Sequence, residues 1–383
     1  MLPSTLRVLV VGAGIAGLAV SRALRRAGFR PEVVEKLPAS TVPGAGIFLP
    51  GNAARALRDL GLDEPVRPLG DVVERQRFLD ARGRELCEVD LGKLWAGVGE
   101  CRALPRADLQ RVLLSSVGGD VRFDTELTRL DLKPDHETIG AAEGADSTHR
   151  TAEATFGDGS TATYDLVIGA DGRKSSVRSL AALGGPAHPV GQVVYRSVVT
   201  GGPRIAEWTA LLGQRSAFVA MPMGGGRLYL YADEAGTSAP ADPLGRLREV
   251  FGQFGAPAPA VLDAVEKVQV ALTDEVEIGS WSRGPVVLVG DAAHATSPTL
   301  SEGAAMAFED GLVLAETLVG ATTVPDALRR YESRRRPRAK WVLDRTRDRD
   351  RTRDVAPALR DPLLRGRGDR IFREHYRLLV DPA

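Results

Sequence analysis

The chain has 383 residues, of which 43% are hydrophobic and 26% charged, and its formal net charge is zero. This composition predicts a globular protein with room for two cores, and the balanced charge argues against a nucleic-acid partner or an anionic membrane. The two cysteines, Cys87 and Cys101, favour a reducing, cytoplasmic setting without a disulfide framework. No apolar run approaches the roughly 20 residues needed to span a bilayer, and no metal-ligand spacing is visible.

The N-terminal residues 7–36 have the pattern of a strand, a glycine turn, a helix and a second strand. An apolar run leads into Gly12, Gly14 and Gly17, which form the pattern G-x-G-x-x-G. In a dinucleotide site these glycines permit the turn, let the backbone approach a pyrophosphate and allow the helix to pack on the strand. The helix expected from about residue 15 to 27 would direct unpaired N–H groups at the phosphates.

Glu35 ends the second strand of this unit, where a carboxylate can accept both hydroxyls of an adenosine ribose. The same carboxylate would repel a ribose 2′-phosphate, so the pattern argues against NADP at this site. A plain βαβ unit with a tight turn is the alternative. The pattern predicts an adenine dinucleotide without choosing between NAD and FAD.

The elements expected next alternate between helices and strands. They are a glycine-rich turn at 43–46 with an extended segment to 49, a helix at 51–60, a hairpin at 72–89, a helix at 104–114, a polar hairpin tip at 133–150 and a buried strand at 164–169. Residues 188–277 then alternate as strands, interrupted by a helix at about 243–254, which predicts a separate sheet domain.

Beyond the sheet domain, the sequence predicts a buried strand and two helices. The strand covers 286–290, a long helix covers about 299–318, and a charged helix covers about 326–353. Arginine and aspartate are densely mixed in residues 334–354. The expectation for that run is a solvated helix with pairs at i,i+4.

Two further motifs directly follow buried strands. Asp171-Gly172 comes after the strand at 164–169, and Gly290-Asp291 comes after the strand at 286–290. Because open α/β sheets bind ligands at the carboxyl ends of their strands, Asp291 is placed to accept polyol hydroxyls. The helix after Pro298 would aim its N-terminus at the same crevice. The alternatives are a tight turn for Asp171 and a helix cap for Asp291.

With the N-terminal glycines, these motifs strongly resemble those of the para-hydroxybenzoate hydroxylase-like family, the group A FAD-dependent aromatic monooxygenases. The resemblance covers nearly the whole chain. It implies an α/β fold with a Rossmann-like FAD-binding domain (GR2-type), an interleaved mixed β-sheet substrate domain and a C-terminal helical segment. The expected ranges are 1–70, 100–185 and 283–325 for the FAD-binding domain, 71–99 and 186–282 for the substrate domain, and 326–383 for the C-terminal segment.

The resemblance implies an FAD-dependent NAD(P)H:oxygen monooxygenase (EC 1.14.13.-) that hydroxylates or epoxidises an aromatic or polycyclic small molecule through a flavin C4a-hydroperoxide. FAD would be bound non-covalently, with NADH or NADPH and dioxygen as co-substrates. A monomer or homodimer in the cytoplasm is expected. The alternatives are a flavin-dependent reductase or dehydrogenase of the same fold and a redox-silent FAD-binding protein.

The motifs and the resemblance together assign a set of residues to FAD. These are Gly12, Gly14, Ala16, Gly17, Glu35, Lys36, Gly46, Ile47, Arg106, Leu127, Asp171, Gly172, Gly290, Asp291, Pro298, Gly303 and Ala304. The substrate-side candidates on the predicted sheet are Arg196, Arg215 and Tyr229. Apolar and aromatic neighbours either line the substrate or form sheet core, namely Phe218, Met221, Met223 and Tyr231.

The chain departs from the family pattern beside the expected flavin ring. Where the family has Pro-x-x-Gly-x-Gly, Ser301 replaces a glycine and Glu302 stands where glutamine is common. A Glu302 side chain pointing inward would place a carboxylate near the pyrimidine edge and lower the flavin's reduction potential. His294, in the same motif, is expected to be a packed, hydrogen-bonded residue.

Overall fold

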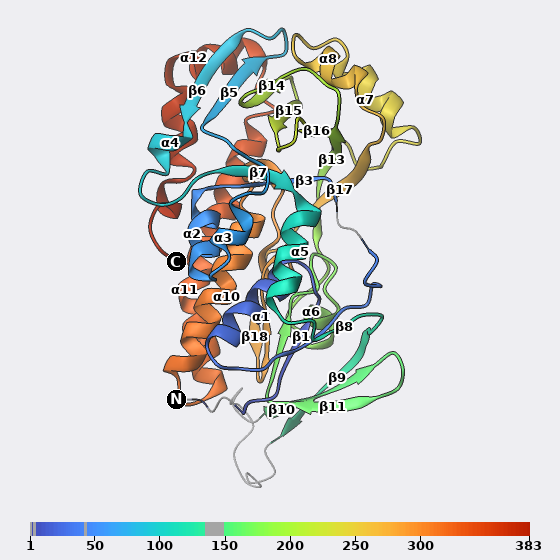
Figure 1. The fold of residues 1–383 in the computed structure, drawn as a ribbon, viewed down its shortest axis with the longest axis vertical. Helices are drawn as coiled ribbons and strands as arrows, with labels where there is room; N and C mark the ends of the chain where they lie inside the picture. The colour runs from blue at the N-terminus through green and yellow to red at the C-terminus, as the bar shows by residue number, and fades with distance from the viewer. Residues whose placement is uncertain (1, 3–4, 42–43, 135–148) are drawn as a thin grey trace.

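The computed structural model describes residues 2, 5–41, 44–134 and 149–383. Figure 1 shows two lobes along the long axis, each built on its own sheet, with helix α11 (Val324–Arg351) along one side of the lower lobe. Within these ranges, no helix has both the length and the apolar character needed to cross a membrane.

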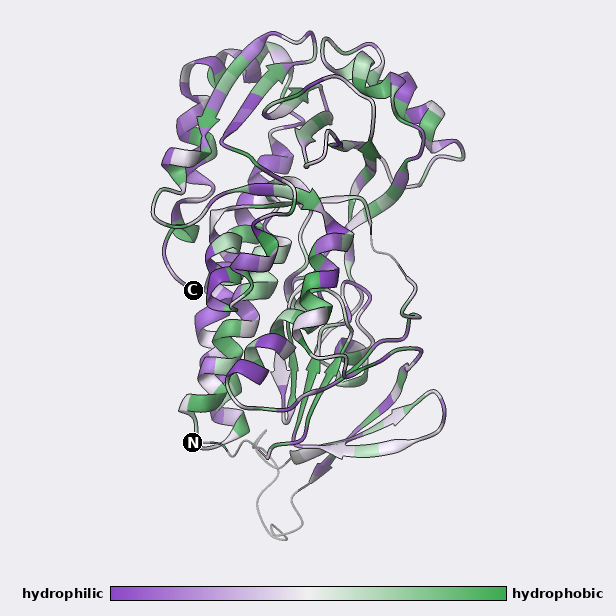
Figure 2. Ribbon diagram, viewed as in Figure 1, coloured by the Kyte–Doolittle hydropathy of each residue, from purple (hydrophilic) through white to green (hydrophobic). Residues whose placement is uncertain are grey.

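The lower lobe is organised around a six-stranded sheet with the order β18-β19-β12-β1-β2-β8. All neighbours are parallel except β18 and β19. The bounds are β1 Val8–Val11, β2 Glu32–Val34, β8 Val121–Arg122, β12 Leu166–Gly169, β18 Ser282–Arg283 and β19 Val286–Leu288. The central strands β1, β12 and β19 are buried throughout, as their continuous apolar runs predict, and Figure 2 shows them as a hydrophobic layer.

Helices α1 (Ile15–Arg26) and α10 (Gly303–Gly320) pack against each other in this lobe. The contact is close because Gly311 has no side chain: a Cβ there would lie 2.9 Å from the Cα of Val20. Five shorter helices occur between α1 and residue 180. They are α2 Gly51–Asp59, α3 Asp63–Val66, α4 Leu91–Leu94, α5 Arg106–Ser116 and α6 Ser176–Leu180. Helix α9 (Asp291–His294) and the 3-10 turn η1 (Pro298–Leu300) follow β19.

The upper lobe is a seven-stranded mixed sheet with the order β17-β13-β16-β15-β14-β5-β6. Only β14 and β5 are parallel neighbours. The bounds are β5 Arg75–Asp80, β6 Glu85–Asp90, β13 His188–Val199, β14 Trp208–Leu212, β15 Ser216–Pro222, β16 Leu228–Ala235 and β17 Gln269–Glu275. The sheet therefore joins the predicted hairpin at 72–89 to the strands of residues 188–277.

Helices cover the upper sheet. Helices α7 (Pro243–Phe251) and α8 (Ala258–Asp263) contribute to one apolar core with its strands, and α12 (Pro357–Glu374) packs against β6. The C-terminal residues 377–379 form the 3-10 turn η2. Figure 1 shows α12 beside β5 and β6, so the C-terminal segment reaches back to the upper lobe.

Two small three-stranded sheets complete the fold. One has the order β3-β7-β4, with β3 Gly46–Leu49, β4 Asp71–Val72 and β7 Arg102–Pro105. The other has the order β11-β10-β9, with β9 Leu127–Pro134, β10 His149–Phe156 and β11 Thr161–Tyr164. The predicted hairpin tip at 133–150 falls mostly on residues 135–148, outside the described residues, while the flanking strands β9 and β10 pair antiparallel.

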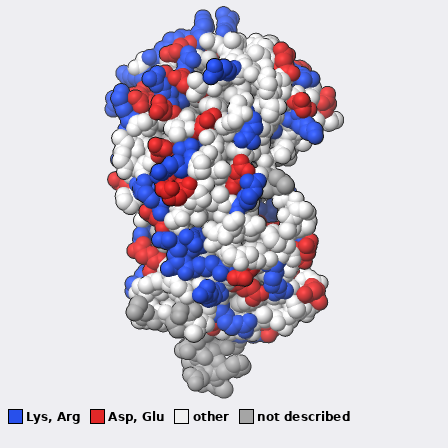
Figure 3. All heavy atoms as spheres, viewed as in Figure 1, with Lys and Arg blue, Asp and Glu red and all other residues white. Residues whose placement is uncertain are grey.

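Two predicted helices begin later than expected. The helix predicted at 104–114 begins at Arg106, because Leu104 and Pro105 belong to β7. The helix predicted from 299 begins at Gly303, after η1. The mixed α/β fold itself is confirmed, and both charge signs are interspersed over the face in Figure 3, in keeping with the zero net charge.

Candidate active site

The glycine turn after β1 shows which of its glycines the fold itself requires. Gly12 has φ +104°, and a Cβ there would lie 2.6 Å from the carbonyl oxygen of Ala170. A Cβ on Gly17 would lie 1.8 Å from the carbonyl oxygen of Gly12. Gly14 is different, because a Cβ on it would meet no described atom within 4 Å. Gly14 is also the N-cap of α1 without a side-chain cap bond, so the site fits an anionic group.

The carboxylate of Glu35 stabilises this turn through hydrogen bonds to backbone N–H groups. Its Oε2 accepts a hydrogen bond from the backbone N–H of Ala13 (2.8 Å), and its Oε1 accepts one from Leu37 (3.0 Å). The backbone N–H of Thr125 donates to the Glu35 carbonyl, which brings the strand that begins at Leu127 beside it. Leu127 is buried and Lys36 exposed, and neither residue lines the cavity described next.

A cavity of about 660 Å³ extends from the glycine turn to the upper sheet. Many residues assigned to FAD line it: Gly14, Ala16, Gly46, Ile47, Arg106, Gly172, Asp291, Pro298, Gly303 and Ala304. The cavity is not lined by Gly12, Gly17, Asp171 or Gly290, which are neighbours of lining residues in the sequence. The structure thus brings three motifs that are far apart in the sequence to one cavity.

The carboxylate of Asp171 is engaged with the protein. Its Oδ2 accepts hydrogen bonds from the backbone N–H groups of Ser176 (2.7 Å) and Val177 (3.0 Å) at the start of α6. The sequence analysis considered only a tight turn as the alternative for Asp171 and did not predict this contact with α6. The cavity-lining residues of this motif are Gly172 and Arg173.

Arg173 was not singled out from the sequence, although it faces Asp291. Its Nε donates to Asp291 Oδ2 (3.1 Å), and its Nη2 donates to the carbonyl of Thr296 (2.7 Å). The side chain of Asp291 is 40% exposed, so part of its carboxylate faces the cavity. An arginine in a turn gives no sequence signal of such a contact.

Behind the cavity, a buried ionic cluster holds the turn at Gly290. Asp310 Oδ2 accepts from the backbone N–H of Gly290 (2.8 Å) and lies 2.6 Å from His294 Nε2, while Asp310 Oδ1 accepts from Arg335 Nε (2.7 Å). Burial would raise the pKa of Asp310, but the charges and hydrogen bonds of His294 and Arg335 outweigh it and lower the pKa. His294 is therefore the packed, hydrogen-bonded residue that was expected.

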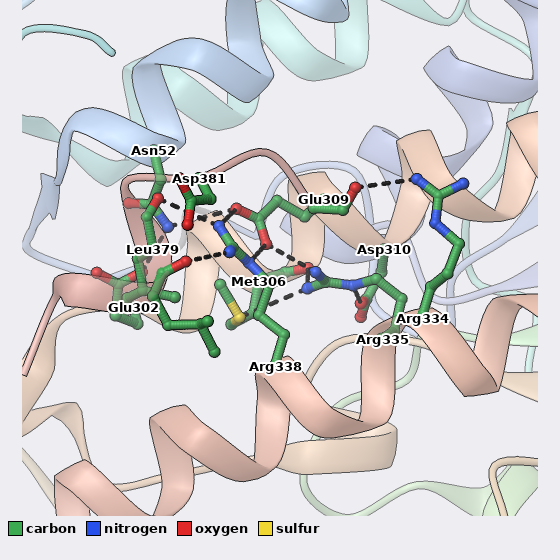
Figure 4. Close-up of polar contacts among 12 residues, drawn as sticks. Asn52, Glu302, Met306, Glu309, Asp310, Arg334, Arg335, Arg338, Leu379 and Asp381 are labelled. Atoms are coloured by element: carbon green, nitrogen blue, oxygen red, sulfur yellow. Dashed lines mark hydrogen bonds and ion pairs between the residues drawn. The ribbon is translucent and has the colours of Figure 1, made fainter.

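The inward position considered for Glu302 is wrong. Glu302 is buried, and Asn52 Nδ2 donates to its Oε2 (2.9 Å), beside Glu309 and Arg338 (Figure 4). Ser301 and Gly303 line the cavity, whereas the side chain between them is directed toward α2. Burial raises the pKa of Glu302 to about 8, which favours the neutral carboxyl at neutral pH.

Ser301 has a backbone conformation that favours glycine. Its φ of 59° and ψ of 25° lie in the left-handed region, where side chains other than glycine are strained. The turn between η1 and α10 therefore has a conformation that favours glycine, although serine occupies it in this chain.

We expect Ser301→Gly to be more stable than Ser301→Ala by about 1 kcal/mol, because only the glycine is unstrained in this conformation. The measurement is urea unfolding of both variants at equal ionic strength. Equal free energies of unfolding, or a more stable alanine variant, would contradict the strained turn.

Two of the three substrate-side candidates line the cavity, and the third does not. Arg196 and Tyr229 line the cavity, and Tyr229 packs on Gly46, where a Cβ would come within 2.4 Å of the tyrosine Cγ. Burial raises the pKa of Tyr229, partly opposed by the charge of Arg196, so its hydroxyl stays protonated at neutral pH.

Arg215 does not reach the cavity. It occupies the turn between β14 and β15 with φ 57°, its side chain is 64% exposed, and its Nε pairs with Asp354 (3.1 Å). Phe218 is also excluded, because alternation along β15 places it in the core on the other face of the sheet, against Phe251. Met223 is buried outside the cavity wall, whereas Met221 and Tyr231 line it.

Several cavity residues were missed by sequence reasoning. They come from the upper sheet and the C-terminal segment and include Trp208, Asp233, Arg349, Arg353, Leu359 and Phe372. Asp233 follows Tyr229 and Tyr231 with period two on β16, which is a readable signal. The C-terminal residues carry none, because their position depends on how α12 returns to the upper lobe.

Comparison with known proteins identifies the family of the chain. Residues 5–346 match the family described as FAD binding domain. An FAD-dependent urate hydroxylase of Mycolicibacterium vanbaalenii is 32% identical over 361 residues, covering 90% of this chain and 88% of that protein. An aurachin C monooxygenase/isomerase of Stigmatella aurantiaca is 33% identical over 344 residues, covering 87% of this chain and 86% of the relative.

A solved structure has the same fold. Klebsiella pneumoniae HpxO complexed with FAD and uric acid has a TM-score of 0.76 at 24% identity, covering 98% of this chain and 92% of that one. The match of the family model over most of the chain and the identity to curated relatives lead to one conclusion. The chain belongs to the FAD-binding family of para-hydroxybenzoate hydroxylase-like aromatic hydroxylases.

Proposed function

We propose that this chain is an FAD-dependent monooxygenase that uses NADH or NADPH and dioxygen to hydroxylate an aromatic small molecule. The observation that carries the proposal is the single cavity that joins the glycine turn and Asp291 to an aromatic sheet face. A flavin site that opens onto an apolar, ring-lined chamber is the arrangement that oxygen transfer to a flat substrate requires. The curated relatives named above include a hydroxylase and a monooxygenase, which supports the same activity.

The residues present fit FAD. The free N-terminus of α1 at Gly14 would receive the pyrophosphate, Glu35 would lie at the ribose end, and Asp291 with Arg106 would hold the ribityl chain. When bound, FAD would supply the redox chemistry, taking a hydride from the nicotinamide and activating dioxygen. The protein supplies binding, orientation and charge.

Two groups with positive charge line the wall expected to face the ring. The N-terminus of α10 at Gly303 and Ala304 lines the cavity without an acidic residue in its first turn. Arg106 also lines the cavity; burial lowers its pKa, but an arginine stays charged at neutral pH. Both groups would stabilise negative charge near the ring wall.

The chamber beyond this wall would exclude water from the reaction. Its sheet face is largely apolar and aromatic, including Trp208, Met221 and Tyr229. Such a surface favours a flat organic ring and holds it in one orientation.

We also propose that the protein is a monomer or homodimer and that it is located in the cytoplasm.

We expect the purified protein to show flavin absorbance, to release FAD on denaturation and to oxidise NADH or NADPH faster when an aromatic substrate is present. The decisive measurement is incorporation of one atom of ¹⁸O from labelled dioxygen into the product. Rapid NAD(P)H oxidation without oxygen incorporation for any accepted aromatic would indicate the reductase alternative. Bound flavin that NADH and NADPH both fail to reduce would indicate the redox-silent alternative.

A further inference from the structure

The cavity face of the upper sheet presents its side chains in three successive rows. On β16 the rows are marked by Tyr229, Tyr231 and Asp233, each two residues from the next. The paired strand β15 carries Met221, Val219 and Ala217 opposite them. All six residues line the cavity, so the rows are an ordered surface from one end to the other.

These rows give the chamber a length. Tyr229 packs on Gly46, one of the residues expected beside the flavin ring, and Asp233 lies four residues farther along the strand. At about 3.3 Å per residue, the Asp233 row is about 13 Å from the Tyr229 row. A single substituted ring is too short to contact both ends.

The far row contains polar atoms that the protein leaves without a well-aligned partner. Asp233 has 0% exposure, and its Oδ2 accepts from Arg353. Asp233 Oδ1 and the neighbouring Tyr231 hydroxyl interact with each other, but neither atom makes a hydrogen bond of good geometry among the described residues. Buried polar atoms usually have partners, so poorly paired ones in a cavity wall indicate a ligand contact.

The charge at this end is distinctive within the cavity. Of the acidic residues that the structure describes, only Asp233 and Asp291 line it, and Asp291 pairs with Arg173 at the flavin end. Arg353 neutralises Asp233, and its guanidinium has only donors, so it fixes which carboxylate oxygen faces away from it. The remaining oxygen is an acceptor, and the Tyr231 hydroxyl beside it does not satisfy it with good geometry.

We propose that Asp233 and Tyr231 form the far end of the substrate site and bind a hydroxyl or N–H group of an elongated aromatic substrate of at least two rings. The reacting ring would lie near Tyr229 and Gly46, and Arg353 is the positioning residue. This inference rests on the proposed function, because the flavin wall defines the reacting end.

The C-terminal segment completes this end of the site. Val355, Leu359 and Leu363 line the cavity while remaining 40%, 72% and 51% exposed, so they form an apolar rim where the cavity meets solvent. An apolar rim suits the flank of a multi-ring molecule. The polar contact at Asp233 then sets its register along the chamber.

The test is calorimetric titration of the FAD-bound protein with 4-hydroxybiphenyl, 4-methoxybiphenyl and phenol. We expect the hydroxyl compound to bind at least about tenfold more tightly than the methoxy compound, the factor expected for a hydrogen bond to a charged group. Phenol should bind more weakly than 4-hydroxybiphenyl by at least the same factor, because it cannot span the rows.

Asp233→Asn should reduce the hydroxyl-to-methoxy ratio to about one. Arg353 would orient the asparagine carbonyl toward itself, which leaves the amide N–H₂ facing the substrate, where both compounds can accept from it. Tyr231→Phe should reduce the ratio several-fold, and within the described protein it removes only the poorly aligned contact between the hydroxyl and Asp233. Glu234→Gln is the matched control, since Glu234 is the next residue on β16 and binds Tyr195 and Arg246 instead; its ratio should equal that of the unsubstituted protein.

An unchanged ratio in both Asp233→Asn and Tyr231→Phe would overturn the inference. So would equal binding of phenol and 4-hydroxybiphenyl, or no binding of either biphenyl. Binding selectivity without hydroxylation of any aromatic would instead count against the proposed function, because the titration does not depend on turnover.

Discussion

Replacing Arg335 with methionine is expected to lower the free energy of unfolding by about 3–5 kcal/mol. Arg335 has 0% exposure and donates to Asp310 Oδ1 (2.7 Å), to Glu309 Oε2 (2.7 Å) and to the Met306 carbonyl (3.2 Å), as Figure 4 shows. Removing the cation takes one counter-charge from each of two buried carboxylates, which leaves Asp310 with His294 and Glu309 with Arg338. An unpaired buried charge costs far more than the original pair contributes.

The same substitution should weaken FAD binding. Asp310 also accepts from the backbone N–H of Gly290, so the turn that presents Asp291 to the cavity depends on its position. Without Arg335, protonation or displacement of Asp310 would loosen that turn. We therefore expect a loss of FAD affinity at temperatures where the variant is still folded.

Arg334→Met is the matched control for this prediction. Arg334 is the preceding residue on α11, its side chain is 38% exposed, and it pairs with Glu316, which is 67% exposed. Exposed pairs contribute roughly 0–1 kcal/mol, so this variant should differ little from the unsubstituted protein. The measurements are the free energy of unfolding in urea and the FAD affinity by titration, compared between the two variants. Similar losses for the two substitutions would refute a specific role for the buried cluster.

The buried cluster also shows where sequence reasoning reached its limit. The charged run at 334–354 predicts a solvated helix, but Arg335 and Arg338 are buried. Their partners Glu309 and Asp310 belong to a different helix, α10, whose sequence is largely apolar. Because the pairing joins residues 25–29 positions apart, periodicity within either helix could not predict it.

What the sequence did predict follows from local physical constraints. The apolar runs of β1 and β12 require strands covered on both faces, and the glycines after β1 require a turn against Ala170. From these features, the position of the motif residues at one edge of the sheet could be predicted without the tertiary structure. The cavity wall around the glycine turn and Asp291 was therefore predicted more fully than the wall formed by the upper sheet and the C-terminal segment.

The substrate side depends on side-chain direction, which a motif does not specify. Arg215 and Arg353 are both arginines near Asp354, but one occupies an exposed turn and the other reaches Asp233. Glu302 stands between two cavity-lining residues and is still directed away from them. In each case the direction of the side chain depends on the backbone conformation at that residue and on packing against a helix that is distant in the sequence.

Alanine substitutions at Gly14 and Gly17 should distinguish a glycine that FAD binding requires from a glycine that folding requires. A Cβ on Gly17 would lie 1.8 Å from the carbonyl oxygen of Gly12, a backbone atom that cannot rotate away. We expect Gly17→Ala to lower the free energy of unfolding by about 3 kcal/mol or more and to abolish FAD binding. Gly14 has φ −74° and ψ −173°, a conformation that alanine adopts readily, and no described atom lies within 4 Å of an added Cβ.

Gly14→Ala should therefore leave the unfolding of the FAD-free protein unchanged within about 0.5 kcal/mol. If the pyrophosphate approaches this backbone, the added methyl group should weaken FAD binding roughly a hundredfold, or by about 2.7 kcal/mol. Gly185→Ala is the control, since Gly185 is exposed and equally unhindered, and it should change neither quantity. Unaltered FAD affinity in Gly14→Ala would show that the pyrophosphate does not lie over this turn. The combination of intact folding and weakened binding would place it there, because Gly14 is the one glycine of the three that the described protein itself does not require.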